Sequence, residues 1–385
     1  MTLRILTVAD TPPDPNLGAA GTELRTAEAL RSLGHHVESI WNDTLGRKIA
    51  HGNLHLLLEL PRAYERAVVD ALRRAEYDVV HVNQPHGFRA ARAVHRISPR
   101  SVFIHRSHGV ELHADEALRP WRARFGGDER RLALRTASAV IRPLLARHSF
   151  AIARAADGHI VSASLDADFL SNRLGVDRAK IAVIPQAAPD AFVAAPAPPM
   201  TSERLPRVLH VAQFAFFKAP MITAASMNRL AAARANLRFT WICDRAHHDE
   251  VRALVSEDVN SRLELLGWMP QEELLAAYDR SGIFLFPSFF EGFGKTFLEA
   301  MSRGLCVVAS DAGGMHDVIE HGRTGVLVPP GDAQAIADAA TALLDDPTRS
   351  AAMSVAAAAA ARAYAWTRVA RETAAFYVSR LEARR

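Results

Sequence analysis

The sequence predicts an α/β protein with two doubly wound, parallel-sheet domains. Three observations support this prediction. Short apolar runs typical of buried strands alternate with amphipathic helical segments along most of the chain. The length of 385 residues is typical of two domains. A proline-rich stretch without hydrophobic periodicity interrupts the alternation near the middle of the chain.

The first series of elements lies in residues 1–195, which we expect to form the N-terminal domain. Its predicted strands are the apolar runs at residues 3–8, 79–82, 102–106, 159–162 and 181–184, and His35 and His36 mark the entry to a further strand. Its predicted helices cover about residues 22–32, 62–75 and 130–155. Parallel strands joined by helices in this way form an open sheet covered on both faces.

A linker is predicted at residues 196–206, because the stretch 194–206 holds four prolines and shows no periodicity. The second domain is expected at residues 207–365. Its predicted strands lie at residues 208–211, 238–243, 263–265, 283–286 and 307–309, and alanine-rich helices follow them. Two such domains bind ligands at the carboxyl ends of their strands, which predicts a central cleft between them.

Composition limits the class of protein. Hydrophobic residues make up 49% and charged residues 23% of the chain, which is typical of globular domains and not of disorder. Cys243 and Cys306 lie in apolar runs, so we expect buried, reduced thiols. No run is long and apolar enough for a membrane span, and the N-terminus begins directly with a strand. We therefore expect a cytoplasmic protein.

The most informative motif is PSFFEGFGKTFLEAM at residues 287–301, between a predicted strand and a predicted helix. Gly292 and Gly294 fall in the connecting turn, where backbone amides can approach a ligand. A helix starting near Lys295 directs its dipole at that turn and favours an anionic diphosphate without a metal. Glu291 and Glu299 flank the turn. The alternative for each carboxylate alone is a solvated helix face.

The triplet Gly294, Lys295, Thr296 is also the ending of the phosphate-binding loop of NTPases. That motif requires a glycine five positions before Gly294, where this chain has Phe289. The spacing therefore argues against an NTPase.

The wider context resembles a known family. Residues 267–301, followed by Arg303-Gly304, VVASDAGG at 307–314 and GVLVPPGD at 325–332, resemble the donor half of the retaining GT-B glycosyltransferases of family 4. The E-x7-E spacing with its embedded G-F-G is specific for that family. The resemblance implies the GT-B fold, in which the last helix, here 366–385, crosses back to complete the N-terminal domain.

The same resemblance assigns roles to the residues of the motif. It places Glu291 against the donor sugar and Glu299 on the nucleotide ribose. Backbone amides of Gly292, Phe293 and Gly294 are expected to hold sugar hydroxyls, and the amides that follow, those of Lys295 and Thr296, the diphosphate.

The N-terminal half is expected to supply the acceptor side. LGAAGT at residues 17–22 follows the first strand and opens a helix, so the resemblance places Gly18 and Gly21 near the acceptor and the donor phosphates. The alternative is an ordinary helix N-terminus capped by Thr22. The run is not G-x-G-x-x-G, which argues against a nicotinamide cofactor. His108 lies just past a buried strand and is followed by Gly109, and the resemblance places its imidazole near the transferred sugar and the diphosphate. The alternative for a single histidine is an ordinary surface or core residue.

Two departures from the family pattern stand out. Lys218 matches the lysine that clamps the donor diphosphate, but Gln213 occupies the position of the usual arginine, and a neutral amide cannot replace a guanidinium fork. Lys295 and Arg245 are candidates for a substitute cation. The second departure is Gln186-Ala187, where Asn-Gly is common.

The predicted function is a metal-independent, retaining glycosyltransferase that uses a UDP- or GDP-linked sugar as co-substrate and no cofactor. Glu291, His108 and Lys218 are the expected catalytic residues. Since no second carboxylate is placed to attack the anomeric carbon, we expect internal return rather than a double displacement. The alternatives are a silent sugar-nucleotide-binding protein, suggested by Gln213, and a sugar-nucleotide epimerase.

The acceptor class remains open between a glycan, a lipid and a small molecule. From Arg119 to Arg154 the chain holds nine arginines against two acids, which suits peripheral contact with an anionic membrane. A solvated helix face is the alternative, and nucleic-acid binding is disfavoured because no recognised module accompanies the arginines. The cluster Cys243, His247, His248 and Asp249 has the composition of metal ligands, but a polar turn explains it better.

Overall fold

The computed structural model describes residues 1–15, 18–126 and 132–384. The chain divides into two compact units. Unit 1 comprises Met1–Glu116, Asp128–Gln186 and Trp366–Arg385, and unit 2 comprises Ala117–Gly127 and Ala187–Ala365. The longer segment of unit 2 thus begins at Ala187, before the predicted linker 196–206.

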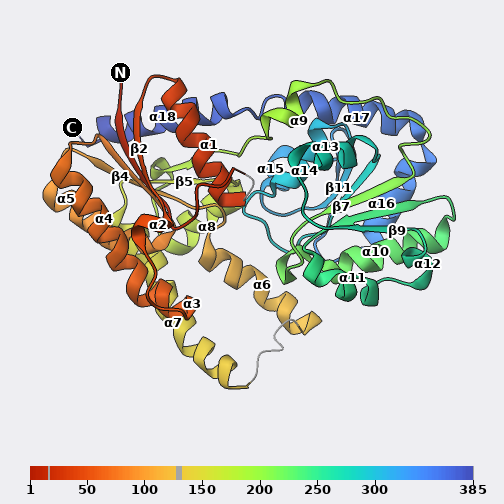
Figure 1. Cartoon of the computed structure of the whole chain (residues 1–385), viewed down its shortest axis with the longest axis horizontal. Coiled ribbons are helices and arrows are strands. Elements are labelled where there is room, and N and C mark those ends of the chain that lie inside the picture. The colour runs from red at the N-terminus through yellow and green to blue at the C-terminus, as the bar shows by residue number, and fades with distance from the viewer. Residues whose placement is uncertain (16–17, 127–131, 385) are drawn as a thin grey trace. The chain divides into compact units, whose positions relative to one another are not determined.

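Unit 1 contains a six-stranded parallel sheet with helices on both faces (Figure 1). The strand order is β2-β1-β3-β4-β5-β6. The strands are β1 (Arg4–Val8), β2 (His36–Ile40), β3 (Val79–Asn83), β4 (Val102–Arg106), β5 (Gly158–Val161) and β6 (Ile181–Val183). The order reverses between β1 and β3, so a topological switch point lies there.

The helices of unit 1 connect these strands, and α6 passes from unit 1 into unit 2. They are α1 (Gly18–Ser32), α2 (Asn42–Leu45), α3 (Gly52–Leu54), the π-helix η1 (His55–Glu59), α4 (Leu60–Arg74), η2 (Pro85–Gly87), α5 (Phe88–Ile97), α6 (Glu111–Phe125), α7 (Leu132–Ala155), α8 (Ser164–Leu174), η3 (Arg178–Lys180) and α18 (Trp366–Glu382). The predicted helix at 22–32 begins four residues earlier than expected, at Gly18. The first residues of the helix predicted at 130–155 lie outside the described ranges.

Unit 2 contains a second six-stranded parallel sheet, with the order β12-β11-β10-β7-β8-β9. Its strands are β7 (Arg207–Val211), β8 (Arg238–Ile242), β9 (Leu263–Leu266), β10 (Ile283–Phe286), β11 (Cys306–Ser310) and β12 (Val326–Val328). This is the dinucleotide-fold order, whose switch point lies between β7 and β10. The two doubly wound parallel sheets confirm the predicted fold class.

The remaining helices cover the second sheet. They are α9 (Asp190–Ala194), η4 (Phe216–Lys218), α10 (Pro220–Ala233), η5 (Arg245–His247), α11 (His248–Leu254), α12 (Glu257–Asn260), α13 (Gln271–Asp279), α14 (Lys295–Ser302), α15 (Gly314–Val318), α16 (Ala333–Asp345) and α17 (Pro347–Ala361).

Eight of the ten predicted apolar runs are interior strands, and the runs at 181–184 and 263–265 are the edge strands β6 and β9. Every residue of β3, β4, β10 and β11 is buried, because helices cover both faces of a parallel sheet. Cys243 and Cys306 are buried and unpaired, as expected. Among the described residues, no helix combines the length and the apolar character needed to cross a membrane.

Candidate functional site

The switch point of the second sheet brings two predicted loops together. One loop follows β7 and carries Gln213 and Lys218, and the other follows β10 and carries Glu291. Because β7 and β10 are neighbours and parallel, both loops leave the same edge of the sheet. A backbone hydrogen bond of 2.8 Å from Phe289 N to Phe217 O joins the loops directly.

Lys218 and Glu291 form an ion pair at this edge. The Nζ of Lys218 donates to Oε1 of Glu291 at 2.6 Å, and Oγ of the buried Ser288 donates to the same oxygen at 2.6 Å. The ammonium also lies 4.9 Å from the ring centroid of Phe286 and 5.2 Å from that of Phe217. The Glu291 side chain is 5% exposed and that of Lys218 15%, so a ligand can reach the ammonium more easily than the carboxylate.

The glycine turn before α14 has the geometry that the sequence predicts. Gly294 precedes the helix with φ +90, and an added Cβ would lie 2.9 Å from Cε1 of Phe286. A second glycine turn, after β11, packs against it. A Cβ on Gly313 would lie 2.1 Å from the carbonyl oxygen of Glu291, and one on Gly314 would lie 2.4 Å from Cδ2 of Phe293. The loop after β11 therefore fixes the backbone that carries Glu291.

Glu299 lies on α14, one turn after Lys295. It is buried, and its Oε2 accepts a hydrogen bond of 3.0 Å from the hydroxyl of Tyr278. Burial raises the pKa of Glu299, although the charge of Lys295 and the bond from Tyr278 act in the opposite direction. The Oγ1 of Thr296 is also buried, and within the described part of the chain it has no hydrogen-bond partner.

Gln213, at the position of the usual arginine, is exposed. The two candidates for a substitute cation, Arg245 and Lys295, lie in different places. Arg245 follows β8 and lies against Gly267, which follows β9, because a Cβ on Gly267 would be 2.5 Å from its Nε. β9 lies on the side of β8 opposite to β7, so the structure does not bring Arg245 to the Lys218 and Glu291 pair. Lys295 stands at the first position of α14, beside the glycine turn.

An aromatic cluster that the sequence did not predict packs on the loop after β10. The ring of Trp121, near the end of α6, stacks on Phe289 with centroids 4.7 Å apart, and Phe125 and Phe216 lie 5.4 Å from the same ring. Trp121 also fills the space above Gly331, where an added Cβ would be 2.4 Å from its Cζ3. The segment 117–126 thus packs on Phe289, two residues before Glu291, and supports the loop that carries Glu291.

In unit 1, His108 follows β4 at the carboxyl edge of the sheet. Its Nε2 lies 2.7 Å from Oε1 of Glu23 on α1, and the guanidinium of Arg106 lies 3.5 Å from the same oxygen. Burial alone raises the pKa of Glu23, but the hydrogen bond with His108 and the charge of Arg106 outweigh it and lower that pKa to about 2. His81, on β3, lies 3.8 Å from the other carboxylate oxygen. Glu23 is therefore a buried, ionised carboxylate.

Gln186, at the last position of unit 1 before unit 2, connects to this network. Its Nε2 lies 3.4 Å from Nδ1 of His108, and Thr22 donates to its Oε1 at 3.0 Å. The same hydroxyl lies 3.0 Å from the carbonyl oxygen of Gly18, so its single proton is shared between the two acceptors, and Thr22 bonds inside α1 rather than capping it. The departure from Asn-Gly noted in the sequence therefore has a structural role: the longer amide bridges His108 and α1.

The predicted glycines of the first loop differ in their surroundings. A Cβ on Gly21 would lie 2.4 Å from the carbonyl oxygen of Pro15, so the close approach of α1 to the preceding loop requires a glycine. Gly18 has open space around it. Leu17, which opens the predicted run, lies outside the described residues.

No group of three or more histidine, cysteine or acidic side chains suited to a metal ion occurs in the described ranges. In the cluster noted in the sequence, His247 instead stacks on Phe214 with centroids 4.9 Å apart, and its Nδ1 lies 2.7 Å from Oε1 of Glu250.

Two family profiles match the chain. Residues 18–192 match the family described as Glycosyltransferase Family 4, and residues 205–346 match the family described as Glycosyl transferases group 1. The chain belongs to the group 1, family 4 type of glycosyltransferases. Among characterised members, D-inositol 3-phosphate glycosyltransferase of Pseudarthrobacter chlorophenolicus is 35% identical over 160 residues, which cover 41% of this chain and 38% of that protein. The match thus spans less than half of the relative's length.

Solved structures of glycosyltransferases share the whole fold. Sucrose-phosphate synthase of Thermosynechococcus elongatus superposes with a TM-score of 0.75 at 21% identity, covering 99% of this chain and 100% of the other. HepE of Anabaena, solved with UDP, gives a TM-score of 0.69 at 17% identity, covering 98% and 100%. At these identities the likeness establishes the fold, and the GT-B prediction is confirmed.

Proposed function

We propose that this glycosyltransferase-family chain moves a sugar from a nucleotide diphosphate to an acceptor hydroxyl, with retention of anomeric configuration and without a metal ion. The observation that supports this most is the Lys218 and Glu291 pair at the switch point of the second sheet, 2.6 Å apart and beside a glycine turn. Ligands of doubly wound sheets bind at that edge.

The pair suggests how a donor would be held. A diphosphate competes for the partly buried ammonium of Lys218, because it carries more charge than the carboxylate that now accepts from it. Glu291, still bonded to Ser288, would then be released to accept hydrogen bonds from sugar hydroxyls. This exchange of partners creates a binding position for the diphosphate next to one for the sugar hydroxyls, and a nucleotide sugar carries these two groups side by side.

The start of α14 complements the diphosphate. The amides of the first turn of α14 and the positive end of its helix dipole lie next to Gly294. Glu299 lies one turn further along and is oriented by Tyr278, which suits a hydrogen bond with a ribose hydroxyl. The hydroxyl of Thr296, which has no hydrogen-bond partner among the described residues, offers a further donor to the same ligand.

For the chemical step we propose internal return. When Lys218 moves to the diphosphate, Glu291 keeps the hydrogen bond from Ser288, an arrangement that orients a sugar rather than attacks its anomeric carbon. The departing diphosphate then deprotonates the acceptor hydroxyl, while Lys218 and the helix N-terminus stabilise its charge. We assign His108, whose ring Glu23 and Gln186 orient, to the contact with the transferred sugar.

The donor and acceptor are proposed by class. HepE was solved with UDP, so UDP-sugars come first in a donor screen, before GDP- and ADP-sugars. The acceptor is a glycan, a lipid or a small molecule. We propose a cytoplasmic location, with the arginines from Arg119 to Arg154 as a peripheral contact to an anionic membrane. Four of the charged residues in that segment, at positions 128–131, lie outside the described ranges.

Binding and transfer test the proposal separately. A ligand that binds the folded state raises the melting temperature, so UDP-, GDP- and ADP-sugars are compared with and without a chelator. Donor hydrolysis or transfer distinguishes an active enzyme from a silent binder, and NMR of the anomeric product establishes retention. An interconverted sugar nucleotide would instead indicate an epimerase. If no sugar nucleotide moves the melting curve, the proposed donor site is wrong.

A further inference from the structure

A cavity lies between α5 and α7 of unit 1, and its lining residues are not among those of the candidate site. It has a volume of about 630 Å³, and it is lined by Arg92, His95, Arg147, Phe150, Ala151, Arg154 and Ala155. The two helices pack against each other (Figure 1). On α7 the lining residues recur at the spacing of one helix face, and on α5 Arg92 and His95 lie three residues apart on the facing side.

Three of the lining residues are the arginines Arg92, Arg147 and Arg154. Within the described ranges their guanidinium groups form no ion pair and donate no hydrogen bond, although the guanidinium of Arg92 lies 5.6 Å from the ring centroid of Phe88. All three are exposed to solvent. Like charges that converge on one cavity repel each other, so the arrangement favours an anion between them.

Asp157, the acid next to the cavity, already has several hydrogen-bond partners. Asp157 lies 3.0 Å from Nε2 of His95, accepts from the backbone of Phe103 at 2.7 Å and accepts from Arg384 at 2.6 Å. These partners lower its pKa, against the effect of burial. Asp157 is therefore not available to neutralise the three arginines.

Helix-end electrostatics explain only part of this composition. His95 and Arg154 stand in the last turns of α5 and α7, where a positive charge complements the helix dipole. Arg147 lies two turns earlier on α7, and Arg92 lies in the middle of α5, where that effect has faded. A second reason is needed for two of the three arginines.

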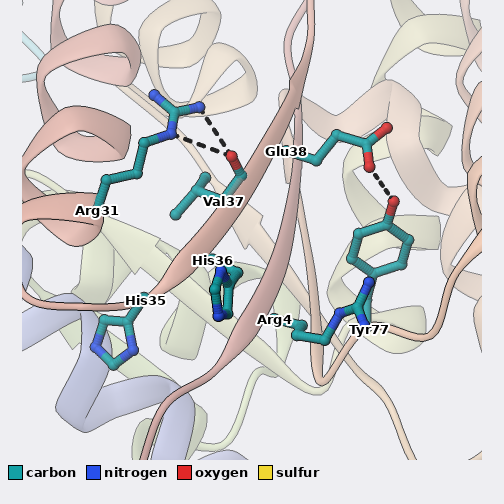
Figure 2. Close-up of a pocket in the computed structure, with 7 residues that line it drawn as sticks. All are labelled: Arg4, Arg31, His35, His36, Val37, Glu38 and Tyr77. Carbon is teal, nitrogen blue, oxygen red and sulfur yellow. Dashed lines mark hydrogen bonds between the residues drawn. The ribbon is translucent and has the colours of Figure 1, made fainter.

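A second cavity in the same unit provides a contrast (Figure 2). It has a volume of about 340 Å³ and lies at the amino edge of the sheet, where Arg31 donates to the carbonyl of Val37 at 2.9 and 3.1 Å. Glu38, bonded to Tyr77, lines the same space and supplies a negative charge. That cavity has a carboxylate among its lining residues, whereas the cavity between α5 and α7 has none.

We propose that the α5–α7 cavity binds a phosphate group that carries at least two negative charges. Guanidinium forks match phosphate oxygens in pairs, and three of them provide more donors than one phosphate can use. The apolar floor of Phe150, Ala151 and Ala155 accommodates the group that carries the phosphate. The site goes beyond the proposed transfer reaction: α7 ends just before β5 begins, so Arg154 lies at the amino edge of the sheet, opposite the edge that carries His108.

Two sources supply this chemistry, a free phosphorylated metabolite and a phospholipid headgroup. Calorimetric titration of the full chain with inorganic pyrophosphate, with excess UDP present to fill the proposed donor site, tests the first. Co-sedimentation with vesicles that contain phosphatidic acid, a phosphomonoester, against phosphatidylcholine vesicles tests the second. We expect the triple variant Arg92→Ala, Arg147→Ala, Arg154→Ala to weaken binding in at least one arm by about tenfold or more, because three charge-assisted donors are lost. Binding to pyrophosphate alone identifies a metabolite site, and binding to vesicles alone a lipid site.

A matched control removes the same charge elsewhere. The triple variant Arg252→Ala, Arg349→Ala, Arg362→Ala replaces three exposed arginines of unit 2 and should bind both probes like the unaltered chain. The proposal is overturned if the unaltered chain binds neither probe, if the α5–α7 variant binds as well as the unaltered chain, or if the two variants lose binding equally. Stabilisation by UDP-sugars should persist in the α5–α7 variant, so this outcome is independent of the donor site.

Discussion

Each unit buries a glutamate at the carboxyl edge of its sheet, but the two carboxylates are held in different ways. Glu23 in unit 1 is surrounded by His108, Arg106 and His81, and its pKa falls to about 2. Glu291 in unit 2 has one ammonium, that of Lys218, and one hydroxyl, that of Ser288.

This difference indicates that Glu23 is fixed in place, whereas the contact between Lys218 and Glu291 can be exchanged. Arg106 is fully buried, so moving Glu23 would leave a guanidinium without its counter-charge in the core, at a high cost. Lys218 is 15% exposed and can change partner without such a loss. We infer that Glu23 holds the ring of His108, whereas the Lys218 and Glu291 pair opens for a ligand.

Loss of Lys218 should have the largest effect on activity. We expect Lys218→Ala to reduce transfer by about 10²–10³-fold, because one preorganised charge on the leaving group disappears. Steady-state kinetics with a UDP-sugar measures this, and circular dichroism checks that the fold is retained. Lys180→Ala, which removes an exposed lysine, is the control. A Lys218 variant with unchanged kcat and KM would show that the pair has only a structural role.

Loss of the Glu23 charge should chiefly affect stability. Glu23→Gln leaves Arg106 buried without an anion and is expected to reduce the free energy of unfolding by about 3–5 kcal/mol. Urea denaturation measures the loss, and Glu291→Gln, whose partner can reach solvent, should lose less. Equal losses in the two variants would remove the distinction between the fixed and the exchangeable glutamate.

Mild acid should weaken unit 1 more than unit 2. Burial lowers the pKa of His81 and His159 to about 4 and that of His86 to about 3, and unit 2 has one comparable residue in its described part, His210, also at about 4. Above pH 6.5 these rings are neutral in the folded and the unfolded chain. As the pH falls below 6.5, these histidines bind protons in the unfolded chain but not in the folded chain. The free energy of unfolding therefore declines toward pH 4, for each histidine by up to roughly 1.4 kcal/mol for every unit by which its pKa in the folded chain lies below 6.5.

Hydrogen-exchange pulse labelling in urea resolves the two units. Samples are equilibrated at pH 7 and at pH 5 and then labelled at one common pH, so that intrinsic exchange rates cancel. We expect peptides of unit 1 to become labelled at a lower urea concentration in the samples from pH 5 than in those from pH 7. For peptides of unit 2 we expect a smaller difference in urea concentration. Parallel shifts of both units would contradict the assignment of the acid-sensitive histidines.

The sequence predicted elements with a strong local signal. All ten predicted strands match observed strands to within one residue at each end. For β2 the pattern indicated only the entry, at His35 and His36, because this edge strand is largely open to solvent and gives a weak apolar signal. The pattern did not define β12, an apolar edge strand of only three residues. The motif at residues 287–301 could likewise be identified from the sequence, because its turn and its helix lie next to each other in the chain.

Long-range partners were less accessible to sequence reasoning. Glu23 meets His108 across 85 positions, and Thr22 meets Gln186 across 164. One local signal did exist: Glu23, Ala27 and Leu30 share a helix face, and an acid on a buried face needs a partner. Nothing near Trp121 in the sequence indicates that it stacks on a loop 168 positions later.

Loss of the Trp121 stack should have a smaller effect than any of the changes above, and it tests whether the loop of Glu291 needs external support. An aromatic pair contributes roughly 0.5–1.5 kcal/mol beyond its buried area, so Trp121→Ala should raise the KM for the donor several-fold with a smaller change in kcat. Trp121→Phe should restore most of the loss, because a smaller ring still stacks on Phe289. Trp268→Ala, which removes a half-exposed tryptophan, serves as the control. If Trp121→Ala instead lowers kcat and leaves KM unchanged, the stack acts on the chemical step, and the loop around Glu291 holds its shape without α6.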